Sequence, residues 1–156
     1  MSLRVGIGVD AHAFTEGVPL VLGGVRFDSP RGLAGHSDGD VITHALIDAV
    51  LGAAGLGDIG SLFPSDGSTP QGISSLDLLQ DAVAQVREAG YSVVNADCVL
   101  IGEEPRIAAR RGELDQTLTN LIGAPVSVRA TTTDRLGFTG RGEGLAAQAV
   151  ALVERA

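Results

Sequence analysis

The sequence predicts an α/β (α+β) fold, a two-layer sandwich in which a small mixed β-sheet carries helices on one face. The 156 residues suit a single domain, and no linker or shift in composition divides residues 1–156. Segments with strand-like alternation take turns with segments of helical spacing along the chain. Hydrophobic residues make up 44% but aromatic residues only 3%, so the core must be built from Ala, Val, Leu and Ile.

The first half of the chain predicts a strand, a hairpin and a helix. Apolar residues alternate with polar or small ones from Leu3 to Val9, which is typical of a half-buried strand. Residues 19–27 predict two short β segments joined at Gly23-Gly24 as a hairpin. A helix is expected from about residue 40 to residue 54, ending against Gly55.

The segment that follows this helix is rich in turn-forming residues. Residues 57–64 have the Gly and Pro density of a structured turn. Small polar residues dominate 65–74, which is either a mobile lid or a flexible connection. A flexible connection is the favoured interpretation, because it is the commoner role of such a segment.

The second half alternates helices and strands. Apolar residues at 76, 79, 83 and 86 predict an amphipathic helix over 75–88, capped by Ser74 or Ser75 and stopped by Ala89-Gly90. We expect strands at 91–101 and 125–132, and helices at 106–122 and 144–155. Helices on one face would leave the other sheet face apolar and uncovered, which predicts a symmetric oligomer.

Charge and cysteine content exclude several classes of protein. A net charge of −8 argues against nucleic acid or an anionic membrane as a partner. All 11 basic residues are Arg, so a phosphate must be bound by guanidinium groups, backbone N–H groups or metal ions. The single cysteine, Cys98, excludes an internal disulfide and lies in an apolar run where it should be buried and inert. No signal peptide, transit leader or membrane span is recognisable, so we expect a cytoplasmic protein.

The three histidines fall within the first 44 residues and predict a metal site. Asp10 and His12 stand two apart at the end of the first strand, so their side chains leave the same face. His44 lies near the first turn of the helix that follows. Two imidazoles and one carboxylate are a common ligand set for Zn²⁺, with a fourth position left for water or substrate.

The competing interpretation is that these are ordinary polar side chains. A DxH triplet is common by chance, and a helical histidine is usually just hydrogen-bonded. Asp40 and Asp48 lie four residues on either side of His44, so one of them could orient its second ring nitrogen. Solvated surface charge is the favoured alternative for at least one of the two.

Two further segments could contact an anion. Residues 102–106 join a strand to a helix, whose first N–H groups could receive an anion or a base edge, although an ordinary turn explains them as well. Residues 130–144 hold three consecutive threonines, Asp134, two arginines and four glycines. That composition suits a phosphate and Mg²⁺, with a glycine-rich structural turn as the competitor.

Four motifs together resemble the 2-C-methyl-D-erythritol 2,4-cyclodiphosphate synthase family, in order and over nearly the whole chain. They are GVDAHAF (8–14), AGHSDGD followed by His44 (34–44), GLGDIGSLFP (55–64) and RATTTDRLGFTGRGEG (129–144). The resemblance implies a homotrimer, assembled around its sheets, with active sites between subunits, a catalytic Zn²⁺ and a second ion, Mg²⁺ or Mn²⁺. It implies that 4-diphosphocytidyl-2-C-methyl-D-erythritol 2-phosphate is cyclised with release of CMP, which makes the enzyme a phosphorus–oxygen lyase.

The resemblance also assigns roles by position. Asp134 stands where the family usually has a glutamate for the second metal ion, and it is one methylene shorter. Arg141 and Glu143 match a pair near the trimer axis, where family members can enclose a cavity for an isoprenoid diphosphate. The matched zinc ligands are Asp10, His12 and His44; the matched substrate-binding positions are His36 and Ser37 for the 2-phosphate region, Asp58 and Gly60 for the methylerythritol hydroxyls, Gly102, Pro105, Arg106 and Ile107 for the cytosine, and Thr131, Thr132 and Thr133 for the cytidine diphosphate.

Two other functions fit part of this pattern. A metal-dependent phosphoesterase could use a zinc-bound water on an external substrate. A non-catalytic trimer that binds metal or isoprenoid could keep the fold without turnover. The motifs favour the cyclase over both, because they include nucleotide-pocket as well as metal positions.

Overall fold

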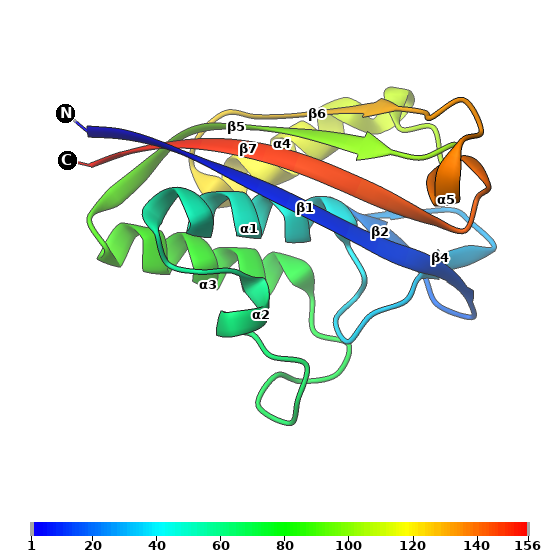
Figure 1. The fold of residues 1–156 in the computed structure, drawn as a ribbon, viewed down its shortest axis with the longest axis horizontal. Helices are drawn as coiled ribbons and strands as arrows, with labels where there is room; N and C mark the ends of the chain where they lie inside the picture. The colour runs from blue at the N-terminus through cyan, green and yellow to red at the C-terminus, as the bar shows by residue number, and fades with distance from the viewer. Residues whose placement is uncertain (1, 156) are drawn as a thin grey trace.

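The computed structural model describes residues 2–155, which form a five-stranded mixed sheet with helices packed on one face (Figure 1). The strand order is β4-β1-β7-β5-β6, and only the β5–β6 pair is parallel. The elements in chain order are β1 (Ser2–Glu16), β2 (Leu20–Leu22), β3 (Val25–Phe27), β4 (Arg31–Leu33), α1 (Val41–Ala54), α2 (Ile59–Leu62), α3 (Ser75–Glu88), β5 (Tyr91–Ile101), a 3₁₀ turn (Ala108–Arg110), α4 (Arg111–Ile122), β6 (Val126–Thr131), α5 (Gly137–Gly140) and β7 (Gly144–Arg155).

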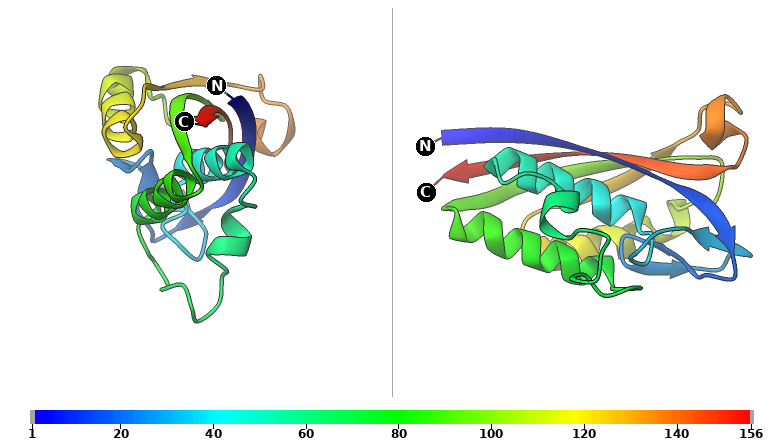
Figure 2. Two further views of the ribbon diagram at one scale, coloured as in Figure 1. Left: turned by 90° about the vertical axis from the view of Figure 1, so that its left-hand side faces the viewer. Right: turned by 60° about the horizontal axis from the view of Figure 1, so that its bottom comes forward.

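The predicted two-layer arrangement with helices on one sheet face is confirmed. Helix α1 lies against β1 and β7, α3 lies beside α1 and contacts β5, and α4 covers β6. The two further views of Figure 2 show the twisted sheet on one side and these helices on the other. Within residues 2–155, no helix is both long and apolar enough to cross a membrane.

Two glycines of β1 allow α1 to approach the sheet closely. A Cβ atom on Gly6 would collide with the carbonyl oxygen of Ala49, and one on Gly8 would collide with that of Ala45. These are backbone atoms of α1, which cannot move aside as a flexible side chain can. The close approach holds the first turn of α1 beside the end of β1, where Asp10 and His12 lie.

The predicted closing helix over 144–155 is wrong, because these residues form strand β7. The strand pairs with β1 on one side and β5 on the other along nearly its whole length. Buried residues recur every second position from Leu145 to Val153, which is strand periodicity. Alanine favours a helix in isolation, but pairing with two neighbours outweighs that weak preference, and small side chains at the centre of the sheet leave room for α1.

The other predicted elements are present, with shifted boundaries. The hairpin β2–β3 turns at Gly23-Gly24, and the helix expected from residue 106 begins only at Arg111, after the 3₁₀ turn. Cys98 is buried, as expected, and burial raises the pKa of its thiol to about 12. Strand β4 and the short helices α2 and α5 were not expected as separate elements.

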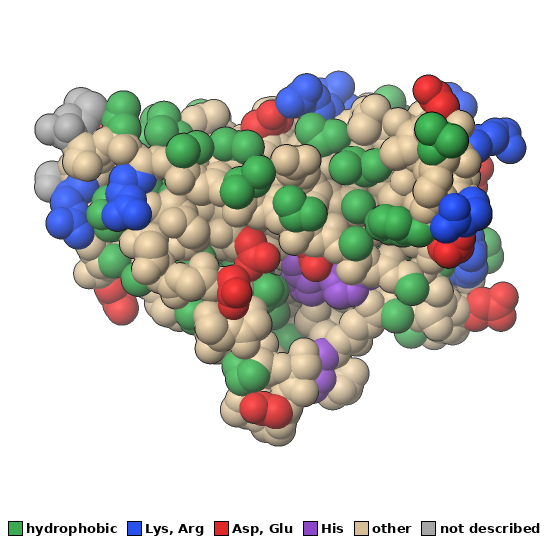
Figure 3. Space-filling model, in the orientation of Figure 1, with side chains coloured by type: hydrophobic (Ala, Val, Ile, Leu, Met, Phe, Trp, Pro, Cys, Tyr) green, Lys and Arg blue, Asp and Glu red, His purple; other side chains and the backbone are tan. Residues whose placement is uncertain are grey.

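The uncovered sheet face is apolar, as predicted. Leu3, Val5, Ile7 and Val9 of β1 are 55–69% exposed, and Val150 of β7 is 42% exposed. The register places Ile7 opposite Val150 and continues this apolar stripe across both strands. Hydrophobic side chains are accordingly visible along the strands in Figure 3. A water-exposed stripe of this kind favours association with another surface.

Replacing Gly8 with Ala should lower the free energy of unfolding by about 2 kcal/mol or more, because the added methyl group collides with backbone of α1. The matched control is Gly112→Ala in α4, where an added Cβ meets nothing within 4 Å. That change should be neutral or stabilise by up to about 1 kcal/mol through helix propensity. Urea unfolding of both variants measures the difference, and equal effects would contradict the packing argument.

Candidate metal centre and adjoining pockets

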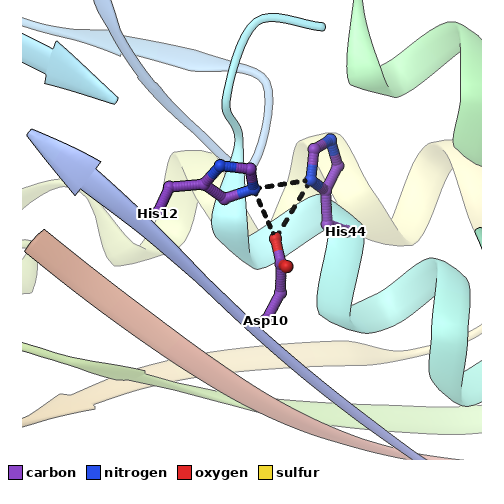
Figure 4. Close-up of side chains that lie close together, drawn as sticks. All are labelled: Asp10, His12 and His44. Atoms are coloured by element: carbon purple, nitrogen blue, oxygen red, sulfur yellow. Dashed lines mark hydrogen bonds and ion pairs between the residues drawn. The ribbon is translucent and has the colours of Figure 1, made fainter. Parts of the chain in front are cut away.

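Asp10, His12 and His44 converge on one point between β1 and α1 (Figure 4). Oδ2 of Asp10 lies 2.7 Å from Nε2 of His12 and 3.0 Å from Nδ1 of His44. The two ring nitrogens are 3.1 Å apart. The three residues predicted as metal ligands are therefore brought together, two by strand alternation and one by the packing of α1.

A buried aspartate fixes the start of α1. Asp40 is the N-cap: its carboxylate accepts hydrogen bonds from Thr43 N and Oγ1, and also from the backbone N–H groups of Gly23 and Gly24. Burial raises the pKa of this fully buried carboxyl group. Asp40 therefore neither orients the His44 ring nor lies at the surface, so both expectations for it were wrong.

Asp48 also has a structural partner. Its carboxylate accepts a hydrogen bond of 2.8 Å from the backbone N–H of Ile59 and so ties α2 to α1. Partial burial raises its pKa.

The outer nitrogen of each clustered histidine has its own partner. Nδ1 of His12 lies 2.6 Å from the carbonyl oxygen of Ala34, which can only accept, so Nδ1 carries the proton and donates it. Nε2 of His44 lies 2.8 Å from Oγ of Ser75 and 2.9 Å from Oγ of Ser37. These contacts leave Nε2 of His12 and Nδ1 of His44 free to present lone pairs to the centre.

The centre is electrostatically suited to a cation. Burial alone would raise the pKa of Asp10, but contact with the protonated forms of His12 and His44 outweighs it and lowers this pKa to about 2. The hydrogen bond to Asp10 raises the pKa of His12. When the inner ring nitrogens carry no proton, the three residues direct lone pairs at one another, and a cation can satisfy that arrangement.

The donor set and its spacing fit a small divalent ion. An ion bound tetrahedrally at about 2.0 Å holds its ligand atoms about 3.3 Å apart, so spreading the present atoms by a few tenths of an ångström makes room. Two imidazoles and a carboxylate suit Zn²⁺, and three protein ligands leave a fourth position open.

A cavity of about 180 Å³ opens beside this centre, and His36, Ser37 and Gly60 line it together with the three clustered residues. Figure 3 shows histidine and acidic side chains gathered in the middle of this face. Asp58 precedes the lining residue Ile59 and caps α2, where its Oδ1 accepts from Ser61 N at 2.8 Å. The predicted residues for the 2-phosphate and the methylerythritol hydroxyls therefore lie beside the metal centre.

The segment 65–74, expected to be a lid or a flexible connection, is hydrogen-bonded onto the metal-site loop. Gly72 N donates to His36 O at 2.7 Å, and Asp38 N donates to Ile73 O at 3.2 Å. Nε2 of His36 donates to Thr69 O at 2.6 Å. The segment thus forms one wall of the cavity, which Ser65 and Thr69 also line.

A second cavity, of about 350 Å³, brings together most of the residues predicted to bind cytidine diphosphate. Its wall combines the turn after β5 with the end of β6 and includes Arg111 and Arg129. Thr133 is the exception, because its hydroxyl donates to Leu136 O at 2.7 Å and braces the following loop. The predicted residues that line this cavity are Gly102, Pro105, Arg106, Ile107, Thr131 and Thr132.

The remaining predicted residues lie in the loops around α5. Asp134 is exposed, has a positive φ of 51°, and its Oδ1 accepts from Thr132 Oγ1 at 3.4 Å. Arg141 and Glu143 form an exposed ion pair with each other, and Arg141 lines a third cavity with Arg31 and Arg135. Asp134 is thus placed beside the cytidine half of the predicted site.

Sequence reasoning missed Ser75 and Asp38 at the metal centre. Asp38 was visible inside the HSDGD motif, and Ser75 was considered only as a helix cap. Ser74 occupies the N-cap position of α3, without a side-chain capping bond, and Ser75 turns its hydroxyl to His44. Only the packing of α3 against the 36–38 loop reveals that contact.

The fold and the clustered side chains define a mixed α/β protein with a candidate metal centre beside a cavity. Comparison with known proteins is more specific: the sequence profile of the YgbB family matches residues 3–154, and the chain belongs to this family.

Individual relatives match this chain over nearly its whole length. The 2-C-methyl-D-erythritol 2,4-cyclodiphosphate synthase of Rubrobacter xylanophilus is 54% identical over 159 residues, covering 98% of this chain and 96% of that protein. The bifunctional IspDF of Campylobacter jejuni superposes with a TM-score of 0.95 at 37% identity, covering 99% of this chain but 43% of that longer one. A 2C-methyl-D-erythritol-2,4-cyclodiphosphate synthase solved with CDP superposes at 0.87 with 37% identity, covering 97% and 100%.

Replacing His44 with Ala should abolish stoichiometric zinc binding, because the centre loses one of its three ligands while the remaining fold is untouched. The measurement is bound zinc after dialysis, by atomic absorption, with circular dichroism to verify folding. His36→Ala is the control, since that ring bonds to Thr69 rather than facing the cluster. Full zinc occupancy in the His44 variant would refute its assignment as a ligand.

Proposed function

We propose that this chain is a phosphorus–oxygen lyase that cyclises 4-diphosphocytidyl-2-C-methyl-D-erythritol 2-phosphate to 2-C-methyl-D-erythritol 2,4-cyclodiphosphate, with release of CMP, in isoprenoid precursor biosynthesis. The observation that carries the proposal is the Asp10–His12–His44 cluster, formed in a chain that matches synthases of this name over nearly its full length.

The reaction needs no nucleophile from the protein. An oxygen of the substrate's 2-phosphate attacks the β-phosphorus, the bond from that phosphorus to the oxygen bridging to the α-phosphate breaks, and CMP departs with that oxygen. Catalysis then depends on holding the two phosphates in line and on neutralising their charge.

Each cavity has a defined task in this proposal. A zinc ion held by Asp10, His12 and His44, and a magnesium or manganese ion at Asp134, would supply charge neutralisation at the phosphate oxygens when bound. His36 and Ser37 line the place of the 2-phosphate, where the Ser37 hydroxyl can donate to it, while Asp58 and the backbone at Gly60 hold the methylerythritol hydroxyls. The second cavity orients the nucleotide: Gly102, Pro105, Arg106 and Ile107 enclose the cytosine, and Thr131 and Thr132 hold the diphosphate. Thr133, which lies outside this cavity, braces the loop that follows them.

The active unit is a homotrimer with each active site at a subunit interface. Among the residues described, the metal-site cavity and the nucleotide cavity have no lining residue in common, which suits a site whose two halves come from neighbouring subunits. The apolar face of β1 and β7 supplies the surface that would be buried. Arg141 and Glu143 would then lie near the axis, where an isoprenoid diphosphate could bind.

Incubating the purified protein with the diphosphocytidyl substrate, Zn²⁺ and Mg²⁺ should release CMP and the cyclic diphosphate in equal amounts, as followed by ³¹P NMR and chromatography. Removing the metals with a chelator should stop both, and adding them back should restore both. CMP with a linear product would instead indicate a phosphoesterase. Metal or isoprenoid binding without CMP would indicate a non-catalytic trimer.

Placing a charge on the uncovered sheet face should break the oligomer. Ile7→Asp puts a carboxylate in the middle of the apolar stripe, whose burial without a partner is costly. The wild type should sediment at three times its 15.9 kDa chain mass, and the variant as a single chain. Val18→Asp, at an exposed valine in the turn after β1, is the control and should remain a trimer.

A further inference from the structure

The hydroxyl of Ser75 lies at the centre of a hydrogen-bonded chain that ends at the metal centre. Ser75 is fully buried at the start of α3, and its Oγ lies 2.8 Å from Nε2 of His44. On its other side the same hydroxyl contacts Oδ1 of Asp38. Asp38 is itself held in place, because it accepts from Ser75 N at 3.0 Å and from Asp40 N at 3.1 Å.

The donors and acceptors fix the direction of this hydrogen-bonded chain. An ionised carboxylate can only accept, so the Ser75 hydroxyl donates its single proton to Asp38. The oxygen of Ser75 is then left as an acceptor toward His44, and Nε2 of His44 must be the donor. A neutral imidazole with its proton on Nε2 carries its lone pair on Nδ1, the atom that faces Asp10 and His12.

Ser37 is a poorer candidate for this role, although its Oγ is also 2.9 Å from Nε2 of His44. Ser37 is only partly buried and lines the cavity, and its neighbouring hydrogen-bond contacts, to Ser75 Oγ at 3.4 Å and Gly39 N at 3.5 Å, are long. No carboxylate fixes the direction of its hydroxyl. Ser37 is therefore free to turn toward a ligand while Ser75 remains with His44.

Asp10 favours the opposite tautomer of the His44 ring. Its Oδ2 lies 3.0 Å from Nδ1 of His44, and in the absence of a metal a carboxylate at that distance favours a proton on Nδ1. A proton there blocks the nitrogen that has to bind the metal. A second acceptor at Nε2 is needed to hold the proton on the outer side of the ring.

We propose that Ser75, held by Asp38, is a positioning residue that keeps His44 in the tautomer able to bind the metal and so raises metal affinity. This rests on the metal site of the proposed function. It also joins the metal centre to the 65–74 segment, because Gly72 and Ile73 bond to the same 36–38 loop that carries Asp38. Docking of α3 and loading of the metal centre then stabilise each other.

The test compares Ser75→Ala with Ser74→Ala. Both change one hydroxyl at the start of α3, but Ser74 makes no side-chain capping bond. Competition with a zinc chelator should show zinc affinity about 10-fold weaker for Ser75→Ala, in the range expected when a ligand's outer partner is lost, and unchanged for Ser74→Ala. Both metal-free variants should remain folded, as thermal unfolding checks, with Ser75→Ala the less stable because Asp38 and His44 each lose a buried hydrogen-bond partner.

A second measurement reads the tautomer without any metal. The protein has three histidines, so its ¹⁵N spectra contain the signals of only three imidazole rings. The spectra are recorded without metal and at a pH where the imidazoles are neutral. The His44 proton should move from Nε2 toward Nδ1 in Ser75→Ala and stay in place in Ser74→Ala. His44→Gln assigns the pattern.

The outcomes separate this inference from the proposed function. Unchanged zinc affinity and an unchanged His44 pattern in Ser75→Ala would overturn the inference, as would a loss confined to Ser37→Ala. If the wild type binds no zinc, the metal role in the proposed function fails, and the tautomer comparison still decides the role of Ser75. Asp38→Asn, which keeps the size of the side chain but weakens its pull on the hydroxyl, should shift the tautomer in the same direction.

Discussion

The direct contact between the backbone of α1 and the glycines of β1 is the constraint on which the rest of the structure depends. Gly6 and Gly8 leave no side chain between strand and helix, so the two elements can hold only one spacing. Asp10 and His12 continue the same side of β1 beyond these glycines, and His44 lies in the first turn of α1. The distance between the ligands is therefore set by the packing of two long elements, rather than by loops. A site held in this way is preorganised, and little free energy is lost in assembling it around an ion.

The polar network around the centre serves that same geometry. Asp40 caps α1 and at the same time binds the hairpin turn at Gly23-Gly24, which fixes where the helix begins. Ala34 orients one imidazole by its carbonyl group, and Ser75 orients the other through Asp38. A chain without lysine must bring positive charge to a phosphate by arginine, N–H groups or metal ions. This network orients the three side chains that would hold a metal ion.

Local patterns predicted that Asp10, His12 and His44 lie together, because strand alternation and helix position are readable from a few neighbouring residues. The same patterns missed β7: its alanines favour a helix on local propensity, and only pairing with β1 and β5 makes the segment a strand. They also missed the partnership of Ser75 and Asp38, which are 37 residues apart and meet only when α3 packs on the loop before α1. Asp40 was misassigned because its carboxylate bonds to Thr43 and to the hairpin turn at Gly23-Gly24 instead of facing His44. Sequence reasoning therefore failed where the structure depends on tertiary contacts.

Strand β1 has two faces with separate tasks, and this division connects assembly to chemistry. Even-numbered positions from Gly6 to His12 face α1 and carry the ligands, whereas the odd-numbered positions from Leu3 to Val9 form the exposed apolar stripe. A subunit packed on the stripe would press on the backbone that holds Asp10 and His12. Because the second cavity is lined by other residues than the metal-site cavity, the same contact would also bring a neighbour's half of the proposed site into range. Burial of apolar surface would thus stabilise the oligomer and complete the active site in a single step.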